Sequence, residues 1–237
     1  MTMSFDDAKK KAGYAAIDNH VTKNGMKVGV GSGSTIVFSV ERLSEKLNSG
    51  ELKDIITVCT SYQSTLLCQE KGITVTTLDD PRIDGKLDLA IDGADEFDEN
   101  LDLIKGGGGA HTQEKIIDST AEFFVVVVDE RKKSRYLGEK WAVPIEVIPA
   151  ALNPVMKALK TRKSEPVLRM AKAKMGPVVT DNGNFIIDAN FGAIKEPAKL
   201  EAELNNIPGV VENGIFSGMT SVVYMGKSDG SVEVFKK

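Results

Sequence analysis

The sequence predicts an α/β protein with a mainly parallel sheet and a second, smaller α+β domain. Three observations lead to this prediction. Short apolar segments alternate with helix-like segments over the first two-thirds of the chain. The longest apolar run, residues 123–128, is typical of a strand buried on both faces of a parallel sheet. Beyond Trp141, prolines and an Asn-Gly turn within 181–184 break the alternation. Because parallel strands are joined by right-handed crossovers, we expect the first sheet to be doubly wound and Rossmann-like.

Apolar spacing and turn residues give the expected elements in order. Helices are expected over 5–21, 34–47 and 111–121, and extended segments over 27–31, 55–59, 73–77, 87–91, 101–105 and 123–128. Later, Pro154 begins a helix, short strands surround Val167 and Val178, a strand covers 185–189 and a helix follows Pro197. The resulting order, strand–helix–strand–strand–helix–strand, is that of a ferredoxin-like domain.

The expected domain boundaries follow from this change of pattern. Residues 221–235 carry two further strands that we expect to return to the first sheet. We therefore assign residues 1–139 with 218–237 to the Rossmann-like domain, and 140–217 to the small α+β domain, with a role in oligomerisation.

Composition excludes several classes of protein. The 237 residues carry 30 Lys and Arg against 34 Asp and Glu, a net charge of −4, which argues against broad nucleic-acid binding. Two cysteines, Cys59 and Cys68, cannot form a disulfide framework or a four-thiolate zinc site. Two distant histidines, His20 and His111, argue against a histidine metal centre. We interpret the polar residues 1–11 as carrying no signal peptide, and the longest apolar run is far shorter than a membrane span, so we expect a cytoplasmic protein with no membrane partner.

A glycine- and hydroxyl-rich loop follows the first predicted strand. Gly31, Ser32, Gly33, Ser34 and Thr35 open the next helix, whose N-terminal N–H groups and dipole favour an anion. The loop matches neither common nucleotide fingerprint, because Ser34 stands where the dinucleotide pattern needs its third glycine. We interpret it as a site for a single phosphoryl group; a tight turn with a hydroxyl cap is the alternative.

An acidic cluster follows the strand over 87–91. Asp92 and Asp95 lie nearest the strand end, where carboxylates serve as acid–base groups or hold a cation. The continuing run from Glu96 to Asp102 does not match an EF-hand, and we expect it to be a solvated loop.

A third cluster combines Lys105, four glycines over 106–109 and Glu114 in the first turn of a helix. Repeated glycine is tolerated where a ligand must touch the backbone. Glu114 is one turn from the apolar Ile117, and burial there raises the pKa of a carboxyl group towards that of a base; an ordinary dipole-favoured glutamate is the alternative. We interpret His111 as a bystander and His20 as structural. Lys132 and Lys133 follow the strand over 123–128, and we expect one of them to reach the same crevice.

Together these clusters resemble one family. The segments VGVGSGST (28–35), DGADE (92–96), KGGG (105–108) and TQEK (112–115) closely resemble ribose-5-phosphate isomerase of the A type, as do PIEVIP (144–149) and IPGV (207–210). The resemblance covers nearly the whole chain in the right order. One departure is His111, where the family usually has an apolar residue.

The resemblance implies an enzyme that interconverts D-ribose 5-phosphate and D-ribulose 5-phosphate through an enediolate, in the non-oxidative pentose phosphate pathway. It implies no metal or other cofactor, a sugar-phosphate substrate, and a homodimer or homotetramer. Its catalytic residues fall on Glu114, Asp92, Asp95 and Lys105. Its substrate and phosphate contacts fall on Lys9, Ser32, Gly33, Ser34, Thr35, Gly93, Ala94, Gly106, Gly107, Gly108 and Lys132.

Two other functions are weighed against the isomerase. A sugar-phosphate sensor of the transcription-regulator type needs a DNA-binding module, and the chain has no spare basic helix-turn-helix segment. A nicotinamide-dependent oxidoreductase needs the third glycine and an acidic residue at the end of the second strand, and both are missing.

Overall fold

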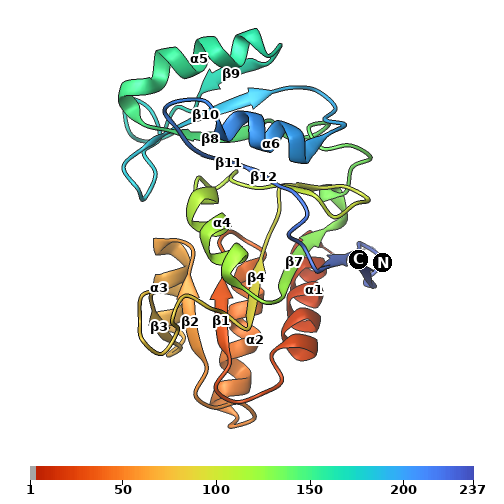
Figure 1. Cartoon of the computed structure of the whole chain (residues 1–237). Helices are drawn as coiled ribbons and strands as arrows, with labels where there is room; N and C mark the ends of the chain where they lie inside the picture. The colour runs from red at the N-terminus through yellow and green to blue at the C-terminus, as the bar shows by residue number, and fades with distance from the viewer. Residues whose placement is uncertain (1–3) are drawn as a thin grey trace. The chain divides into compact units, whose positions relative to one another are not determined.

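The structure is a computed structural model that describes residues 4–237 of the chain. It divides into two compact units (Figure 1). Unit 1 comprises Met1–Ala94, Gln113–Lys132 and Met219–Lys237, and unit 2 comprises Asp95–Thr112 and Lys133–Gly218. Residues 1–3, with which the expected first domain begins, lie outside the described part.

Unit 1 is built on a seven-stranded sheet in the order β14-β13-β7-β4-β1-β2-β3. Its strands are β1 (Lys27–Val30), β2 (Ile56–Cys59), β3 (Thr74–Thr76), β4 (Leu89–Asp92), β7 (Phe124–Asp129), β13 (Val222–Gly226) and β14 (Val232–Lys236). Every neighbouring pair is parallel except β13 with β14. The mainly parallel sheet is therefore confirmed, and the tail returns to it through β13, which pairs with β7.

Helices cover both faces of this sheet. The helices are α1 (Phe5–His20), α2 (Ile36–Asn48), α3 (Tyr62–Glu70) and α4 (His111–Thr120). Val28 and Val30 of β1 point into a core shared with α1 and α2. Gly29, between them, faces the other way, since a Cβ there would lie 2.8 Å from Ile117 of α4. Side chains alternate across a strand, so the two sets of helices lie on opposite faces, as a doubly wound sheet requires.

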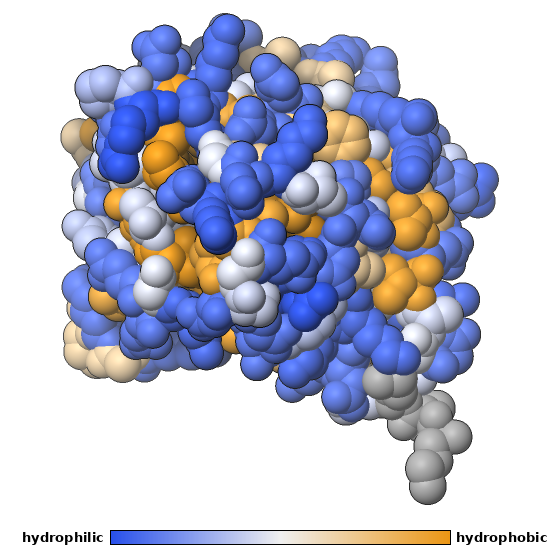
Figure 2. All heavy atoms as spheres, turned by 90° about the horizontal axis from the view of Figure 1, so that it is seen from below, coloured by the Kyte–Doolittle hydropathy of each residue, from blue (hydrophilic) through white to orange (hydrophobic). Residues whose placement is uncertain are grey.

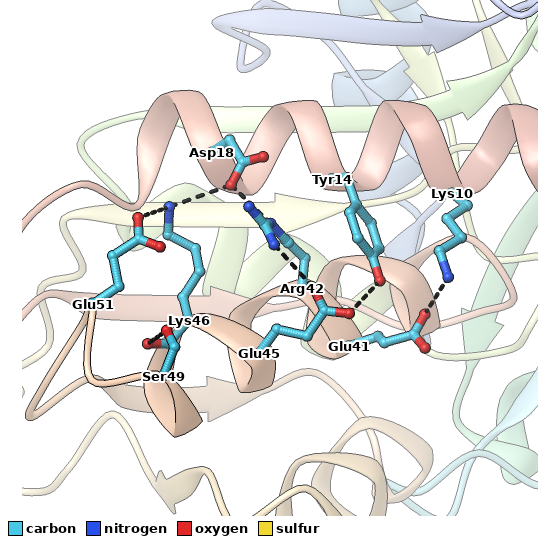
Figure 3. A network of polar contacts seen from close by, with 9 residues as sticks. All are labelled: Lys10, Tyr14, Asp18, Glu41, Arg42, Glu45, Lys46, Ser49 and Glu51. Carbon is cyan, nitrogen blue, oxygen red and sulfur yellow. Dashed lines mark hydrogen bonds and ion pairs between the residues drawn. The ribbon is translucent and has the colours of Figure 1, made fainter.

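Polar side chains of α1 and α2, among them Tyr14, Asp18, Arg42 and Glu45, form hydrogen bonds and ion pairs between the two helices (Figure 3). The Tyr14 hydroxyl donates to Glu45 over 2.8 Å, and Arg42 donates to Asp18 over 2.9 Å. Burial raises the pKa of Asp18, but hydrogen bonds from Arg42 and Lys46 outweigh it and hold that pKa below its ordinary value. Small residues on the buried face of α1, among them Gly13, let the two helices approach closely.

Unit 2 contains the ferredoxin-like arrangement. Its elements are β8 (Val143–Val147), α5 (Leu152–Thr161), β9 (Glu165–Leu168), β10 (Phe185–Asn190), α6 (Pro197–Asn205) and β11 (Val210–Asn213). The strands form an antiparallel sheet in the order β11-β8-β10-β9. The expected strand around Val178 is reduced to two isolated bridges, Met170 with Pro177 and Val179 with Phe185, which lead into the predicted turn with Gly183 at φ +82°.

The domain boundaries differ from those expected. Residues 95–112 and 133–139 belong to unit 2 rather than to the sheet of unit 1. They contribute β5 (Glu96–Phe97) and β6 (Leu103–Ile104) to a small sheet in the order β12-β6-β5, with β12 at Ile215–Phe216. Pairing with a strand more than a hundred residues later leaves no local pattern, so hydrophobic periodicity gave no sign of this small sheet.

Two short 3₁₀ turns complete the chain, η1 (Glu130–Lys132) after β7 and η2 (Pro149–Ala151) before α5. Within residues 4–237, no helix is both long enough and apolar enough to cross a membrane. Figure 2 shows one face of the molecule, on which hydrophilic residues predominate and hydrophobic residues appear in patches between them.

Candidate active site

The predicted phosphate loop of unit 1 connects β1 to α2 with its outer residues exposed. Gly33 has φ +96°, a conformation that favours glycine, and donates its N–H to Gln63 over 3.0 Å. The Lys9 ammonium group lies 3.3 Å from the Ser34 hydroxyl, although α1 is far away in sequence. The loop therefore presents a cation, a hydroxyl group and the first turn of α2 together, which is the chemistry that a phosphate needs.

Thr35 stands at the N-cap of α2 with helical backbone angles, and within the described structure its side chain makes no capping hydrogen bond. The hydroxyl-capped turn, the alternative interpretation of this loop, is therefore not formed by Thr35. The Ser32 side chain contacts the segment that follows β2: its hydroxyl lies 2.7 Å from that of Thr60 and 2.6 Å from that of Ser61. These contacts fix the loop to the neighbouring strand end at β2.

Asp92 ends β4 and is fully buried. Its Oδ1 accepts the N–H of Ser32 over 3.0 Å and the N–H of Gly93 over 2.6 Å. A Cβ at position 31 would overlap the Asp92 carboxylate, so only glycine fits there. The structure therefore brings the phosphate loop and the first aspartate of the acidic cluster into direct contact, as the sheet geometry predicts for neighbouring strand ends.

Glu114 lies in the first turn of α4 and is 5% exposed. Ile117 and Asp118, one turn further along, are buried on the same side of this helix. Glu114 is thus largely desolvated, as expected from its spacing to the apolar face. Lys132 ends η1 directly after β7 and is half-buried, while the preceding Arg131 pairs with Asp129 over 2.8 Å.

The glycine loop of unit 2, defined here as residues 105–109, contains the buried Lys105 and is contacted by the half-buried Asp95. Asp95 accepts the N–H of Gly107 over 2.6 Å. Lys105 is 2% exposed, with its ammonium group 5.4 Å from the centre of the Phe216 ring. Gly106 has φ +101°, and a Cβ there would lie 2.7 Å from Nδ1 of His111. His111 is therefore a packing neighbour of the glycine loop.

Sequence reasoning missed one ion pair at this loop. Nη1 of Arg169 donates to the carbonyl oxygens of Gly106 over 2.9 Å and Gly107 over 3.2 Å. Nε and Nη2 of the same guanidinium donate to the Asp188 carboxylate, over 2.9 Å for Nε. The only local signal was a charge next to the apolar strand at 165–168, and such charges are common at strand ends.

A buried network beside β8 was also missed. Glu146 is fully buried and accepts hydrogen bonds from the hydroxyl groups of Thr112 and Thr180 and from the amides of Asn182 and Asn184. Burial raises the pKa of Glu146, and these hydrogen bonds, led by that from Thr112, lower it below the ordinary value. The network fixes the start of α4, two residues before Glu114.

The expected solvated acidic loop is wrong for two of its residues. Glu96 is fully buried and accepts the N–H groups of Gly138, Lys140 and Trp141 over 3.0–3.2 Å. Asp98 is 4% exposed and accepts the N–H of Asn100 over 2.9 Å. Both carboxylates stabilise turns of unit 2, so they are structural. Among residues 4–237, no group of three or more His, Cys, Asp or Glu side chains is arranged to hold a metal ion.

Each unit therefore holds one part of the predicted set. Unit 1 contains Lys9, the phosphate loop, Asp92, Gly93, Ala94, Glu114 and Lys132. Unit 2 contains Asp95, Lys105 and the glycines at 106–108. The first part offers anion binding and carboxylates, and the second offers backbone N–H groups, a carboxylate and an ammonium group. These are the groups that proton transfer on a phosphorylated substrate requires.

Comparison with known proteins places the chain in a family. The family model described as ribose 5-phosphate isomerase A (phosphoriboisomerase A) matches residues 56–230. A ribose-5-phosphate isomerase A from Thermosynechococcus vestitus is 50% identical over 234 residues, which cover 97% of both chains.

Solved structures agree with the sequence relatives over the whole chain. A D-ribose-5-phosphate isomerase in complex with phospho-erythronic acid superposes with a TM-score of 0.94 at 46% identity, covering 99% of this chain and all of the other. The ribose 5-phosphate isomerase A of Methanocaldococcus jannaschii gives a TM-score of 0.92 at 44% identity, with the same coverage. The chain belongs to the ribose 5-phosphate isomerase A family.

Proposed function

We propose that the chain interconverts D-ribose 5-phosphate and D-ribulose 5-phosphate through an enediolate, with Glu114 as the base at carbon. The observation that carries this proposal is the similarity to ribose-5-phosphate isomerase A over 97% of the chain. A family member is described in complex with phospho-erythronic acid. That acid combines a phosphate with a carboxylate, and an enediolate phosphate likewise combines a phosphate with a negatively charged pair of oxygens.

The reaction moves a proton between C1 and C2 and needs a base at carbon. Glu114 has the required carboxylate and is 5% exposed. Burial favours the neutral form of a carboxyl group and so strengthens its conjugate base. In the proposed mechanism, Glu114 removes the proton from C2 of the open-chain aldose and returns it to C1.

The aldose must first be released from its furanose ring. Asp92 is assigned this step, moving hydroxyl protons during ring opening. Its Oδ1 is occupied by two backbone N–H groups, which stabilise the ionised carboxylate. Asp95 is assigned the orientation of substrate hydroxyl groups and proton transfer between oxygens.

The enediolate develops negative charge on oxygen. Lys105 and the N–H groups of the glycine loop are assigned to stabilise it, since fixed donors in a water-poor site are a large part of catalysis. Lys105 is 2% exposed, which keeps its charge from being screened by solvent.

The phosphate is held away from the reacting carbons. Ser34, Thr35 and Lys9 are assigned this role, supported by the 3.3 Å contact between Lys9 and Ser34. Binding energy gained at the phosphate can position C1 and C2. The remaining assignments to the substrate site are Ser32, Gly33, Gly93, Ala94, Gly106, Gly107, Gly108 and Lys132.

The proposal includes no metal and no other cofactor. Turnover should therefore persist in excess EDTA. Loss of activity that Mg²⁺ or Zn²⁺ restores would contradict this part of the proposal and return the acidic cluster to consideration as a metal site.

The experiment that tests the function is an assay of ribose 5-phosphate conversion with the wild-type enzyme and Glu114→Gln side by side. We expect the glutamine variant to fold normally and to lose at least ~10²-fold in kcat, the lower end for a positioned general base. Circular dichroism checks the fold. Near-wild-type turnover by a folded variant would remove Glu114 from the mechanism.

The same proposal places the reaction in the non-oxidative pentose phosphate pathway and the enzyme in the cytoplasm as a homodimer or homotetramer. The chain has two cysteines, Cys59 and Cys68, and such sparse cysteine usage supports a reducing compartment. Sedimentation analysis of the purified chain tests the oligomeric state, and a monomer at assay concentration would contradict it.

A further inference from the structure

We propose that Arg169, held by Asp188, is a positioning residue for the reaction, because it orients the peptide groups of the glycine loop that receive the enediolate oxygen. This inference rests on the proposed function. All the groups in the proposed contact, Arg169, Asp188 and residues 106–108, lie in unit 2.

Glycine makes the loop hard to hold in one conformation. A glycine peptide group can rotate at low steric cost, so its C=O and N–H can exchange directions. If the carbonyl oxygen faced the developing enediolate, it would repel it, whereas the N–H would stabilise it. A catalytic loop of glycines therefore needs contacts from outside that choose one direction for each peptide group.

Arg169 supplies those contacts on the carbonyl side. Its Nη1 donates to the oxygens of both Gly106 and Gly107, over 2.9 Å and 3.2 Å. In a trans peptide the N–H points opposite to the C=O, and the described chain contains no cis peptide bond. The N–H groups of Gly107 and Gly108 are therefore directed away from Arg169.

The two N–H groups have different surroundings. That of Gly107 donates to Asp95 over 2.6 Å. Gly108 is exposed, and a Cβ there would meet nothing within 4 Å. Within residues 4–237, the Gly108 N–H donates no hydrogen bond. Like the N–H of Gly107, it is directed away from Arg169, and we assign it as the donor to the enediolate oxygen.

Asp188 explains why Arg169 keeps this orientation. The planar guanidinium uses Nε and Nη2 on the two oxygens of Asp188, so that only Nη1 faces the loop. The Arg169 side chain is 16% exposed and that of Asp188 is 29% exposed, so the pair is partly shielded from water. Donation from a charged group also polarises the 107–108 peptide and strengthens its N–H as a donor.

The test compares Arg169→Met with a matched control, Arg162→Met. Arg162 belongs to the same unit and also donates to a backbone carbonyl, that of Ala158 over 2.9 Å, but it lies at the end of α5. We expect Arg169→Met to lower kcat by ~10- to 100-fold, somewhat less than the loss of a whole oxyanion donor. We expect the control to keep wild-type kcat.

Three further measurements separate positioning from a general loss of structure. Inhibition by inorganic phosphate should be unchanged in Arg169→Met, because the phosphate loop belongs to unit 1. Millimolar guanidinium should restore part of the kcat of Arg169→Ala, whereas sodium chloride at the same ionic strength should not. Arg169→Lys keeps the positive charge but lacks the planar guanidinium, so its kcat should lie between those of wild type and Arg169→Met. If Arg169→Met does not fold, the lysine variant still tests the role of Arg169.

The possible failures are distinguishable. If the wild-type enzyme does not convert ribose 5-phosphate, the proposed function falls and this inference falls with it. If the wild type is active, the assignment of Arg169 is overturned by equal kcat in Arg169→Met and Arg162→Met. It is also overturned if guanidinium gives no more recovery than sodium chloride.

Discussion

The two glycine-rich loops of the molecule are built in different ways. In the phosphate loop, Gly31 leaves room for the Asp92 carboxylate and Gly33 forms a turn. Ser34 is exposed, and its hydroxyl lies 3.3 Å from the Lys9 ammonium group, whose side chain is 12% exposed. In the glycine loop over 105–109, the backbone itself is held, by Asp95 on an N–H and by Arg169 on two carbonyls.

This difference teaches how similar compositions serve different tasks. A phosphate carries its charge in the ground state, so hydroxyl groups and a lysine suffice to bind it. An enediolate exists only briefly, and its donors must be aimed before the reaction starts. We therefore expect changes at the phosphate loop to affect KM and changes at the glycine loop to affect kcat, except where a change reaches Asp92.

The largest effect on kcat is expected where a change in the phosphate loop reaches Asp92. Gly31→Ala places a methyl group on the Asp92 carboxylate, which must move. Misplacement of a reacting group by about 1 Å can cost ~10²-fold in rate, and we expect a loss of that size in kcat. Steady-state kinetics measure it.

A matched substitution is available beside Asp92 on the other side. In Gly93→Ala the nearest atoms would lie 3.8 Å from the new methyl group, so its unfolding temperature should match the wild type. A Gly31→Ala enzyme with wild-type kcat would contradict the role given to the Asp92 contact.

The next effect distinguishes two neighbouring glycines of the second loop. In Gly107→Ala the new Cβ would lie 2.7 Å from Asp95 Oδ1 and 2.9 Å from Trp141, whereas in Gly108→Ala it meets nothing within 4 Å. We expect Gly107→Ala to lower the unfolding temperature and to lower kcat by ~10-fold or more. We expect Gly108→Ala to keep the unfolding temperature and to lower kcat/KM, because the substrate occupies that space.

Differential scanning fluorimetry and kinetics on the same samples test this pair. Equal unfolding temperatures for the two alanine variants would show that Asp95 does not hold the loop. Unchanged kcat/KM in Gly108→Ala would remove the substrate from that position.

A smaller effect is expected from the hydroxyl groups of the first loop. Ser34→Ala and Thr35→Ala each remove a donor to a charged phosphate, worth about 1.5 kcal/mol or roughly tenfold in affinity. KM for ribose 5-phosphate should rise by about that factor while kcat stays near wild type. A fall in kcat with unchanged KM would argue against phosphate binding at this loop.

The smallest effect on rate is expected at Glu146, whose contribution is to stability. Glu146→Gln puts an amide donor among the donors that contact the carboxylate, and should lower the free energy of unfolding by about 2 kcal/mol at pH 7. The folded-state pKa of Glu146 lies below its ordinary value of 4.5. The stabilisation is therefore complete above pH 4.5 and is lost as the pH falls through the folded-state pKa.

Denaturation of wild type and variant at several pH values measures this difference. Glu196→Gln serves as the control, since Glu196 forms only an exposed pair with Lys199 at 3.4 Å. A difference between wild type and Glu146→Gln that stays constant down to the lowest pH would contradict an ionised, hydrogen-bonded Glu146.

Much of the architecture could be predicted because it leaves local patterns. The apolar run at 123–128 became β7, and the turn with Gly183 formed where the Asn-Gly pair stands. Both Gly31 and Asp92 were expected at the carboxyl ends of parallel strands, but their contact was not predicted, because it depends on β1 and β4 being neighbours in the sheet.

The parts that sequence reasoning missed depend on partners distant in the chain. Arg169 contacts a loop more than sixty residues earlier in the chain. Glu146 accepts hydrogen bonds from Thr112, earlier in the chain, and from Thr180, later in the chain. Charge patterning treated Glu96 as solvated, but its three N–H partners over 138–141 make it structural. The acidic residues around Glu96 in the sequence do not indicate which distant backbone N–H groups will bind its carboxylate.

The most direct test of Glu114 as a base at carbon is the conversion of ribose 5-phosphate in D₂O, followed by NMR. The wild-type enzyme should place solvent deuterium on the carbon skeleton, because the proton held by a carboxylate exchanges with solvent during the enediolate stage. Glu114→Gln should give no incorporation above the uncatalysed rate. Product formed by the wild type without deuterium, or incorporation by the folded variant at the wild-type rate, would contradict the mechanism.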